Sequence, residues 1–345
     1  MDFRYLNVNN KAHHIIFAAL SFEQRCENAI LKSLESSNPP DEIVLFDYGE
    51  SATAGAQAKR LRDNHWAAIS SAASKAGSHC KKVGVDAYSM TDVEEKVSHF
   101  TLSAGVVEID ISCMTRPHVL ALATVVGRLS DWVEWHVAYT IPESFGNLNS
   151  TESRAGWKDT LWLSLGNRPI LRNQGLAIGL VILGHEADRI GIAFKEIEPA
   201  SGICLIPIRK DRPDLHRHTY SQNREFLAFL KQLRMPGPMG CRASEFFING
   251  GWEIEEVNMD LIVEDTCAIA QRIADAAKKM DAPIVLVPFG PKISVFASAF
   301  VLSKLCPNRT WVIYPVVKTH PIDYSDGVLK TELFSRAIFS KQEYA

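Results

Sequence analysis

Short apolar runs alternate with stretches of helical periodicity along about the first 140 residues. The runs have strand length and are rich in large apolar residues, as in strands buried on both faces of a parallel sheet. They cover residues 14–20, 43–46, 83–88, 106–111 and 135–139, of which 83–88 is the weakest. Helical spacing of apolar residues covers 26–34, 54–73 and 118–129. This alternation predicts a doubly wound, mostly parallel α/β sheet.

The same alternation begins again in the second part of the chain, after residues 143–173, which show little periodicity. A loop rich in Arg, Lys and His is expected before the second of its helices. Strands are predicted at residues 176–183, 202–208 and 284–287, and helices at residues 190–197, 223–233 and 259–279. We therefore expect a first Rossmann-like half at 1–150, a linker or excursion at 151–173 and a second Rossmann-like half at 174–345.

The two parts carry an internal repeat. An offset of 176 (292 − 116) aligns Arg116 with Lys292 and also aligns Trp135 with Trp311, without a gap. Residues 20–23, just after the first strand, correspond to 183–186 at a different offset, 163 (183 − 20). Any two strand–helix–strand units share a binary pattern, so chance similarity is the alternative reading. Four matching features favour a duplication, and thus two halves related by a pseudo-two-fold axis.

Composition and charge favour a globular protein without a general affinity for nucleic acid. Hydrophobic residues make up 46% and charged residues 22%, and the net charge of −3 is too neutral for a polybasic nucleic-acid or membrane binder. The seven cysteines are spaced singly, without the CxxC pairs of structural zinc or redox motifs. No secretory signal and no membrane-spanning apolar stretch is evident. We expect a cytoplasmic protein with reduced thiols and no membrane partner.

Ligands of open parallel sheets bind beyond the carboxyl ends of the strands, where the strand order reverses. Four polar or Gly/Pro turns of this sequence lie there: residues 21–25, 112–116, 184–189 and 288–292. Two of them carry a basic residue at a helix start, which suits a phosphate group. Two such corners would fit an anionic ligand with two or more phosphates. The expected ligand-binding residues are Ser21, Glu23, Arg25, Ser112, Thr115, Arg116, His185, Glu186, Arg189, Gly290 and Lys292.

These turns match neither the GxGxxG nor the GxxxxGK[ST] phosphate motif, so ordinary solvated side chains at helix starts remain an alternative for the two basic residues. Asp110 stands inside an otherwise apolar strand, where a carboxylate needs hydrogen bonds or a nearby cleft. It is the first candidate for a functional acid, with Glu23 and Glu186 as further acid/base candidates. A paired structural role for Asp110, and a helix-capping role for the two glutamates, are the competing readings.

Two other groupings suggest chemistry less strongly. Cys113 beside His118 could form a nucleophile pair, although a buried, inert thiol is the preferred reading because the second half has no equivalent. His185, Glu186 and Asp188 lack a partnering HxxxH or CxxC, so no metal site is predicted. The basic loop contains residues 216–218, His-Arg-His, for which solvated side chains are favoured over phosphate contacts. No cofactor is indicated.

A duplicated Rossmann-like chain with a polar, basic turn between strand and helix resembles the CARF and SAVED nucleotide-sensor domains of prokaryotic antiviral defence. The resemblance implies a ligand bound across the pair of halves, at 112–116 and 288–292, with 21–25 and 184–189 beside them. Those domains bind cyclic oligonucleotides and regulate an attached or partner effector. The turns Ser-Cys-Met-Thr-Arg and Pro-Phe-Gly-Pro-Lys replace the Gly- and Thr-rich turn familiar in CARF domains.

The first functional hypothesis is therefore a ligand-sensing or regulatory subunit that binds a nucleotide-like or phosphorylated small ligand between the halves and acts on an effector protein. An enzyme that uses the same cleft on a nucleotide or phosphorylated metabolite is the alternative. A non-catalytic interaction subunit is the third reading, with contacts through the aromatic residues of 157–162 and through Phe246 and Phe247.

Overall fold

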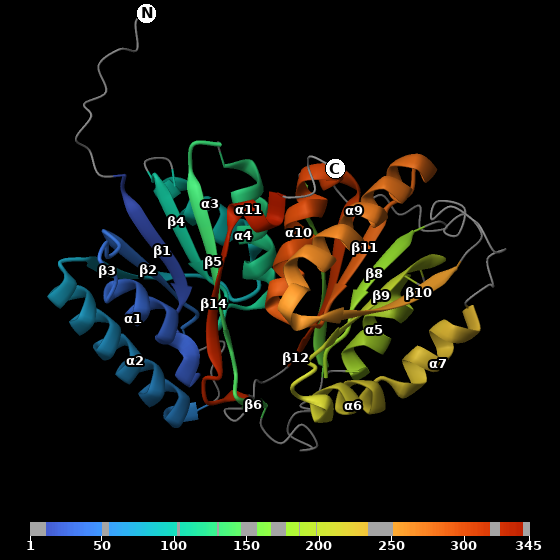
Figure 1. Ribbon diagram of the computed structural model, residues 1–345, viewed down its shortest axis with the longest axis horizontal. Coiled ribbons are helices and arrows are strands. Elements are labelled where there is room, and N and C mark those ends of the chain that lie inside the picture. The colour runs from blue at the N-terminus through green and yellow to red at the C-terminus, as the bar shows by residue number, and fades with distance from the viewer. Residues whose placement is uncertain are drawn as a thin grey trace, which may run out of the picture.

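A computed structural model describes residues 12–49, 55–101, 104–129, 131–145, 157–166, 177–185, 187–197, 199–233, 251–317 and 325–340. Two six-stranded sheets, each flanked by helices, stand side by side (Figure 1). Both are parallel except for one antiparallel edge strand. The predicted α/β fold with two tandem, mostly parallel halves is thus confirmed, while the boundaries expected at 150 and 174 stay a prediction.

The first sheet has the order β14-β5-β4-β1-β2-β3. Its parallel strands are β1 (His14–Ala19), β2 (Glu42–Asp47), β3 (His79–Gly84), β4 (Val106–Asp110) and β5 (Glu134–Ile141), and β14 (Lys330–Ser335) is antiparallel to β5. Its helices are η1 (Gln24–Cys26), α1 (Asn28–Leu34), α2 (Gly55–Ala76), α3 (Met90–Thr101) and α4 (Arg116–Arg128). The strand predicted at 83–88 is wrong: β3 lies at 79–84 because this edge strand is partly exposed and carries Lys81 and Lys82 in place of an apolar run.

The second sheet repeats this plan in the order β10-β9-β8-β11-β12-β7. Its parallel strands are β8 (Ile178–Ile182), β9 (Ser201–Ile208), β10 (Trp252–Asn258), β11 (Ile284–Pro288) and β12 (Thr310–Val317), and β7 (Trp157–Ser164) is antiparallel to β12. Its helices are α5 (Ala187–Ile197), α6 (Pro213–Gln222), α7 (Arg224–Leu233), η2 (Met259–Leu261), α9 (Ile262–Met280), α10 (Lys292–Leu305), η3 (Pro307–Arg309) and α11 (Arg336–Ser340).

The expected basic loop is in part a helix, so that prediction was wrong. Helix α6 covers most of it, with Pro213 in the first turn, where the missing N–H costs no hydrogen bond. The turn expected at 184–189 is shorter, because α5 already begins at Ala187. The patterns of β7, β10 and β14 were not recognised as strands. Of the interaction residues considered, Phe246 and Phe247 lie outside the described residues.

Equivalent hydrogen bonds support the duplication. The residue after the first strand of each half donates its amide to the second strand: Leu20 N to Phe46 O and Leu183 N to Leu205 O, both 2.9 Å. Arg116 and Lys292, aligned by the repeat, are the first residues of α4 and α10. Trp135 on β5 and Trp311 on β12 are both buried.

Helices α4 and α10 pack against each other at the centre, between the sheets, and join the halves (Figure 1). Gly127 of α4 lets the helices approach closely, since a Cβ there would lie 3.1 Å from Ser303 Oγ. The Trp135 ring of the first half lies 5.3 Å from the Phe300 ring of α10 and 5.2 Å from the Phe339 ring of α11, centre to centre. The core is therefore continuous across the two halves.

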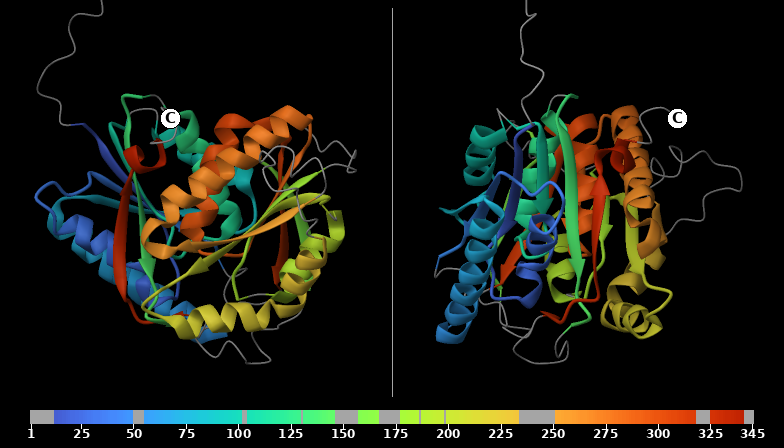
Figure 2. Two further views of the ribbon diagram at one scale, coloured as in Figure 1. Left: turned by 45° about the vertical axis from the view of Figure 1, so that its right-hand side comes forward. Right: turned by 60° about the vertical axis from the view of Figure 1, so that its left-hand side comes forward.

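The halves also exchange strands. Strand β7 follows β5 in the chain but pairs with β12 of the second sheet, and β14 follows β12 but pairs with β5 of the first. Figure 2 shows β14, in red, beside the green β5 in both views. A short ribbon of β6 (Ser144–Phe145) and β13 (Ser325–Asp326) joins the segments that follow β5 and β12. Of the helices in the described ranges, none has the length and apolar character needed to span a bilayer.

Candidate ligand-binding site

A cavity of about 190 Å³ opens at the carboxyl ends of the parallel strands, between the two halves. The turns after β1, β4, β8 and β11 all contribute to its walls, as expected for the switch point of a doubly wound sheet. Of the expected ligand-binding residues, the following line it: Ser21, Glu23, Arg25, Thr115, Arg116, His185, Gly290 and Lys292. The structure therefore brings residues from all four predicted turns to one place.

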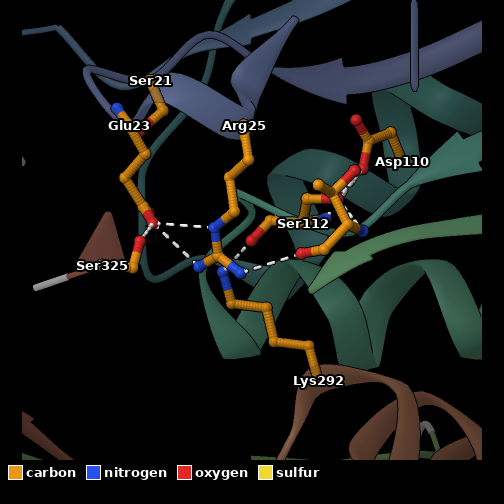
Figure 3. A network of polar contacts seen from close by, with 8 residues as sticks. Ser21, Glu23, Arg25, Asp110, Ser112, Lys292 and Ser325 are labelled. Atoms are coloured by element: carbon orange, nitrogen blue, oxygen red, sulfur yellow. Dashed lines mark hydrogen bonds and ion pairs between the residues drawn. The ribbon is translucent and has the colours of Figure 1, made fainter. Parts of the chain in front are cut away.

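The two aligned basic residues cross from one half to the other. Lys292 Nζ donates to the carbonyl of Ser112 at 2.6 Å, at the end of β4 (Figure 3). Arg116 Nη2 donates to the carbonyls of Phe289 at 2.9 Å and Gly290 at 3.4 Å, after β11. Each cation of the repeat thus reaches the equivalent turn of the opposite half. Ser112 itself is buried and contributes this carbonyl from behind the cavity wall.

The buried Arg25 forms an ion pair with the partly buried Glu23, beside Lys292 (Figure 3). Arg25 donates from Nε and Nη2 to Glu23 Oε2, at 2.9 and 2.8 Å, and from Nη1 to the carbonyl of Thr140 on β5, at 3.1 Å. Ser325 of β13 also donates to Glu23 Oε2. Burial raises the pKa of Glu23, but Arg25, Lys292 and Ser325 outweigh it and hold the pKa below its usual value. The carboxylate is therefore ionised at neutral pH.

Lys292 has an unusually low pKa for a lysine. Burial is the main cause, and the neighbouring Arg25 adds to it, while the Glu23 carboxylate opposes both; together they lower the pKa to about 8. An ammonium in such a place is only weakly stabilised by its present surroundings. An anion placed beside it would restore the charged form.

Asp110 is buried but does not line the cavity. Its carboxylate accepts the amide of Ser112 at 2.9 Å and the hydroxyl of the same residue, and that hydroxyl in turn accepts the amide of Thr140 at 2.7 Å (Figure 3). Burial raises the pKa of Asp110 to about 6, although the bonds from Ser112 oppose the shift. Asp110 therefore holds the turn that carries the Ser112 carbonyl, which explains a carboxylate inside an apolar strand.

The remaining expected residues lie apart from the cavity or outside the description. Arg189 of α5 is buried, donates from Nε to the carbonyl of Pro315 at 3.0 Å and stacks on the rings of Phe289 and Tyr314. This resembles the bond of Arg25 to Thr140, so each half ties its first turn to its last strand with an arginine. Glu186 lies outside the described residues.

Several lining residues were not anticipated. Tyr48 follows β2 and Arg209 follows β9, so the carboxyl-end rule applied to the second strands would have found both. Arg62 lies inside α2, where no local pattern distinguishes it. His216, for which a solvated side chain was favoured, lines the cavity from α6. Arg62 pairs with Asp47 at 3.3 Å and Arg209 with Asp211 at 2.5 Å.

Nucleophilic and metal chemistry find little support in the described residues. Burial, followed by the Glu23 charge, raises the pKa of the Cys113 thiol well above its usual value, which opposes a reactive thiolate. The His118 ring contacts Tyr48 Oη at 3.2 Å and the Asp86 carbonyl at 2.7 Å, and burial lowers its pKa to about 4. No group of three or more potential metal ligands occurs within the described ranges.

Comparison with known proteins gives a likeness of fold. No protein-family model matches the sequence, and no curated protein matches it. A solved structure that resembles the chain is that of a type III CRISPR defence DNA nuclease activated by cyclic oligoadenylate. The two share 8% sequence identity over 91% of this chain and 67% of the other, with a TM-score of 0.47. The likeness is one of fold alone.

Proposed function

We propose that this protein is a ligand sensor that binds a nucleotide-like, phosphate-containing anion in the cavity between its halves. The observation that carries the proposal is the crossed pair of cations, in which Arg116 and Lys292 each reach the equivalent turn of the other half. Both bond to backbone carbonyls there, and neutral carbonyls are weaker partners for a cation than phosphate oxygens.

The charge of the cavity supports an anionic ligand. Among the described lining residues, five are Arg or Lys and one is a carboxylic acid, Glu23. Arg25, Arg62 and Arg209 have carboxylate partners. Arg116 and Lys292 stand at the starts of α4 and α10 and reach into the cavity from opposite halves, a placement that suits a bound phosphate.

The aromatic part of the lining supports a nucleotide over a simple anion. Phe22 is the partly exposed ring of the wall, and Tyr48, Tyr139, Phe289 and Tyr314 contribute to it with largely buried side chains. Aromatic rings beside basic groups are the surfaces on which bases stack while phosphates are bound electrostatically.

Binding is better supported than catalysis. An acid/base catalyst needs a pKa near the working pH, whereas Arg25 and Lys292 keep that of Glu23 low. Asp110, whose pKa is higher, lies behind the wall and is engaged by Ser112. A sensor also needs an output, so the effector partner expected from the resemblance stays part of the proposal.

The test is a ligand panel with matched variants. Thermal shift and calorimetry with adenosine mono- and triphosphate and with cyclic oligoadenylates should reveal at least one ligand. Lys292→Gln and Arg116→Gln should each weaken it about tenfold or more, since each removes a charge-assisted bond. Lys304→Gln and Arg128→Gln, at the far ends of the same two helices, should leave the affinity unchanged. The proposal would be refuted if the variants at the far helix ends weakened binding as much as Lys292→Gln and Arg116→Gln, or if no ligand of the panel bound.

A further inference from the structure

Glu23 is the only carboxylate among the described residues that line the cavity. The acids that pair with the other cations, Asp47 and Asp211, do not line it. Glu23 therefore occupies space and positive charge that an anionic ligand would need. Its partners are three donors: the two guanidinium nitrogens of Arg25 and the hydroxyl of Ser325.

A carboxylate in this place has two opposing effects. It stabilises the buried guanidinium of Arg25 and the ammonium of Lys292 while the cavity holds no anion, since unpaired buried cations are costly. It repels any anion that approaches those cations, because like charges a few ångströms apart interact strongly where water is scarce.

We propose that Glu23 is a built-in counter-anion of the cavity, which an incoming anionic ligand must displace from Arg25, beside Lys292. The inference rests on the proposed function, since it concerns what that ligand competes with. Glu23 thereby sets the threshold for binding: it weakens the affinity for every anion and keeps the empty cavity intact.

The displacement would reach the surface through Ser325. This residue belongs to β13, which pairs with β6, and the two strands come from the second and the first half of the chain. The hydrogen bond from Ser325 to Glu23 joins this ribbon to the cavity wall (Figure 3). When Glu23 moves away from Arg25, that bond changes as well, so the ribbon responds to occupancy.

The experiment compares the affinity of the full-length protein and of Glu23→Gln for inorganic pyrophosphate, by calorimetry at pH 7.5. Glutamine keeps the acceptor oxygen for Arg25 and Ser325 but removes the charge. Glu23→Gln should bind at least about tenfold more tightly, the factor expected from removing one unit charge nearby. Glu27→Gln, in the same segment but not in the lining, controls for net charge and should leave the affinity unchanged.

Ser325→Ala serves as a second variant, because it leaves the ion pair of Glu23 and Arg25 in place. It should bind pyrophosphate about two- to fivefold more tightly, and its ribbon amides should exchange hydrogen faster than those of the ligand-free wild type. If the wild type binds pyrophosphate and Glu23→Gln binds it equally or more weakly, this inference is overturned, while the proposed function stands. If Glu23→Gln does not fold, an unchanged affinity of Ser325→Ala for pyrophosphate overturns the inference instead. Absence of binding by all the proteins, with no ligand in the panel, overturns the proposed function and this inference together.

Discussion

The low pKa of Lys292 makes anion binding dependent on pH in a calculable way. Burial and the nearby Arg25 set that pKa at about 8 in the empty cavity. A bound anion that contacts the ammonium favours its charged form, so the pKa of Lys292 is higher in the complex than in the free protein. Raising the pH from 7 to 9 then neutralises the lysine of the free protein, and binding must be accompanied by proton uptake.

The size of the effect follows from the titration curve. With a pKa of about 8, roughly 9% of Lys292 is neutral at pH 7 and roughly 91% at pH 9. The apparent affinity should therefore fall about tenfold over this range, equivalent to about 1.4 kcal/mol. At pH 8 the binding of one ligand should take up about half a proton.

Isothermal titration calorimetry with a phosphodiester ligand provides the assay, because phosphodiesters do not titrate between pH 7 and 9. Measurements in two buffers of different ionisation enthalpy give the number of protons taken up. Lys292→Arg keeps its charge throughout this range and should bind with an affinity independent of pH. A flat profile in the wild type, or the same fall in Lys292→Arg, would refute the role assigned to this lysine.

Three further predictions concern the framework of the site. Asp110→Asn should not lower the melting temperature at pH 7.5, because the amide keeps an acceptor oxygen for Ser112. Since burial raises the native pKa to about 6, the advantage of the variant should grow as the pH rises from about 4 to 6; a difference that does not change with pH would contradict the raised pKa. Trp135→Ala should cost about 3–5 kcal/mol in denaturant unfolding, since its ring is buried against α10; a loss below 1 kcal/mol would show that the halves do not depend on it. Gly184→Ala should destabilise the protein because its Cβ would lie 2.0 Å from the Phe289 carbonyl, whereas Gly191→Ala on α5, with open space around it, should melt at the same or a higher temperature.

The parts of the fold that rest on local pattern could be predicted from the sequence. Strands buried on both faces, such as β1 and β4, show as apolar runs, and the turns that follow them then locate the cavity. Edge strands cannot be recognised from apolar runs in this way. No residue of β3 or β14 is fully buried, so neither strand needs an apolar run of its own.

The position of the site could be predicted, but the hydrogen-bond partners of its residues could not. The repeat pointed to Arg116 and Lys292, yet nothing in the sequence says that each bonds to the opposite half, since that depends on how α4 and α10 pack. Arg189 lies in an expected turn, but its guanidinium donates a hydrogen bond to the Pro315 carbonyl, 126 residues away in the sequence. The place of Arg62 in the cavity wall could not be predicted from the sequence, because this residue lies in the middle of a long polar helix.

Because the two sheets exchange strands, the halves of this chain depend on each other for a complete sheet. A homodimer of one half, built in the same way, would be intertwined, with each subunit's last strand completing its partner's sheet. Fusion of two such copies makes that mutual dependence permanent. If the chain were cut between Gly166 and Ala177, β5 would lose its partner β14 to the second fragment and β12 would lose its partner β7 to the first. Each fragment would then expose a strand edge that is paired in the intact chain. The two pieces should therefore be insoluble when expressed alone, recover when expressed together, and unfold in a single transition.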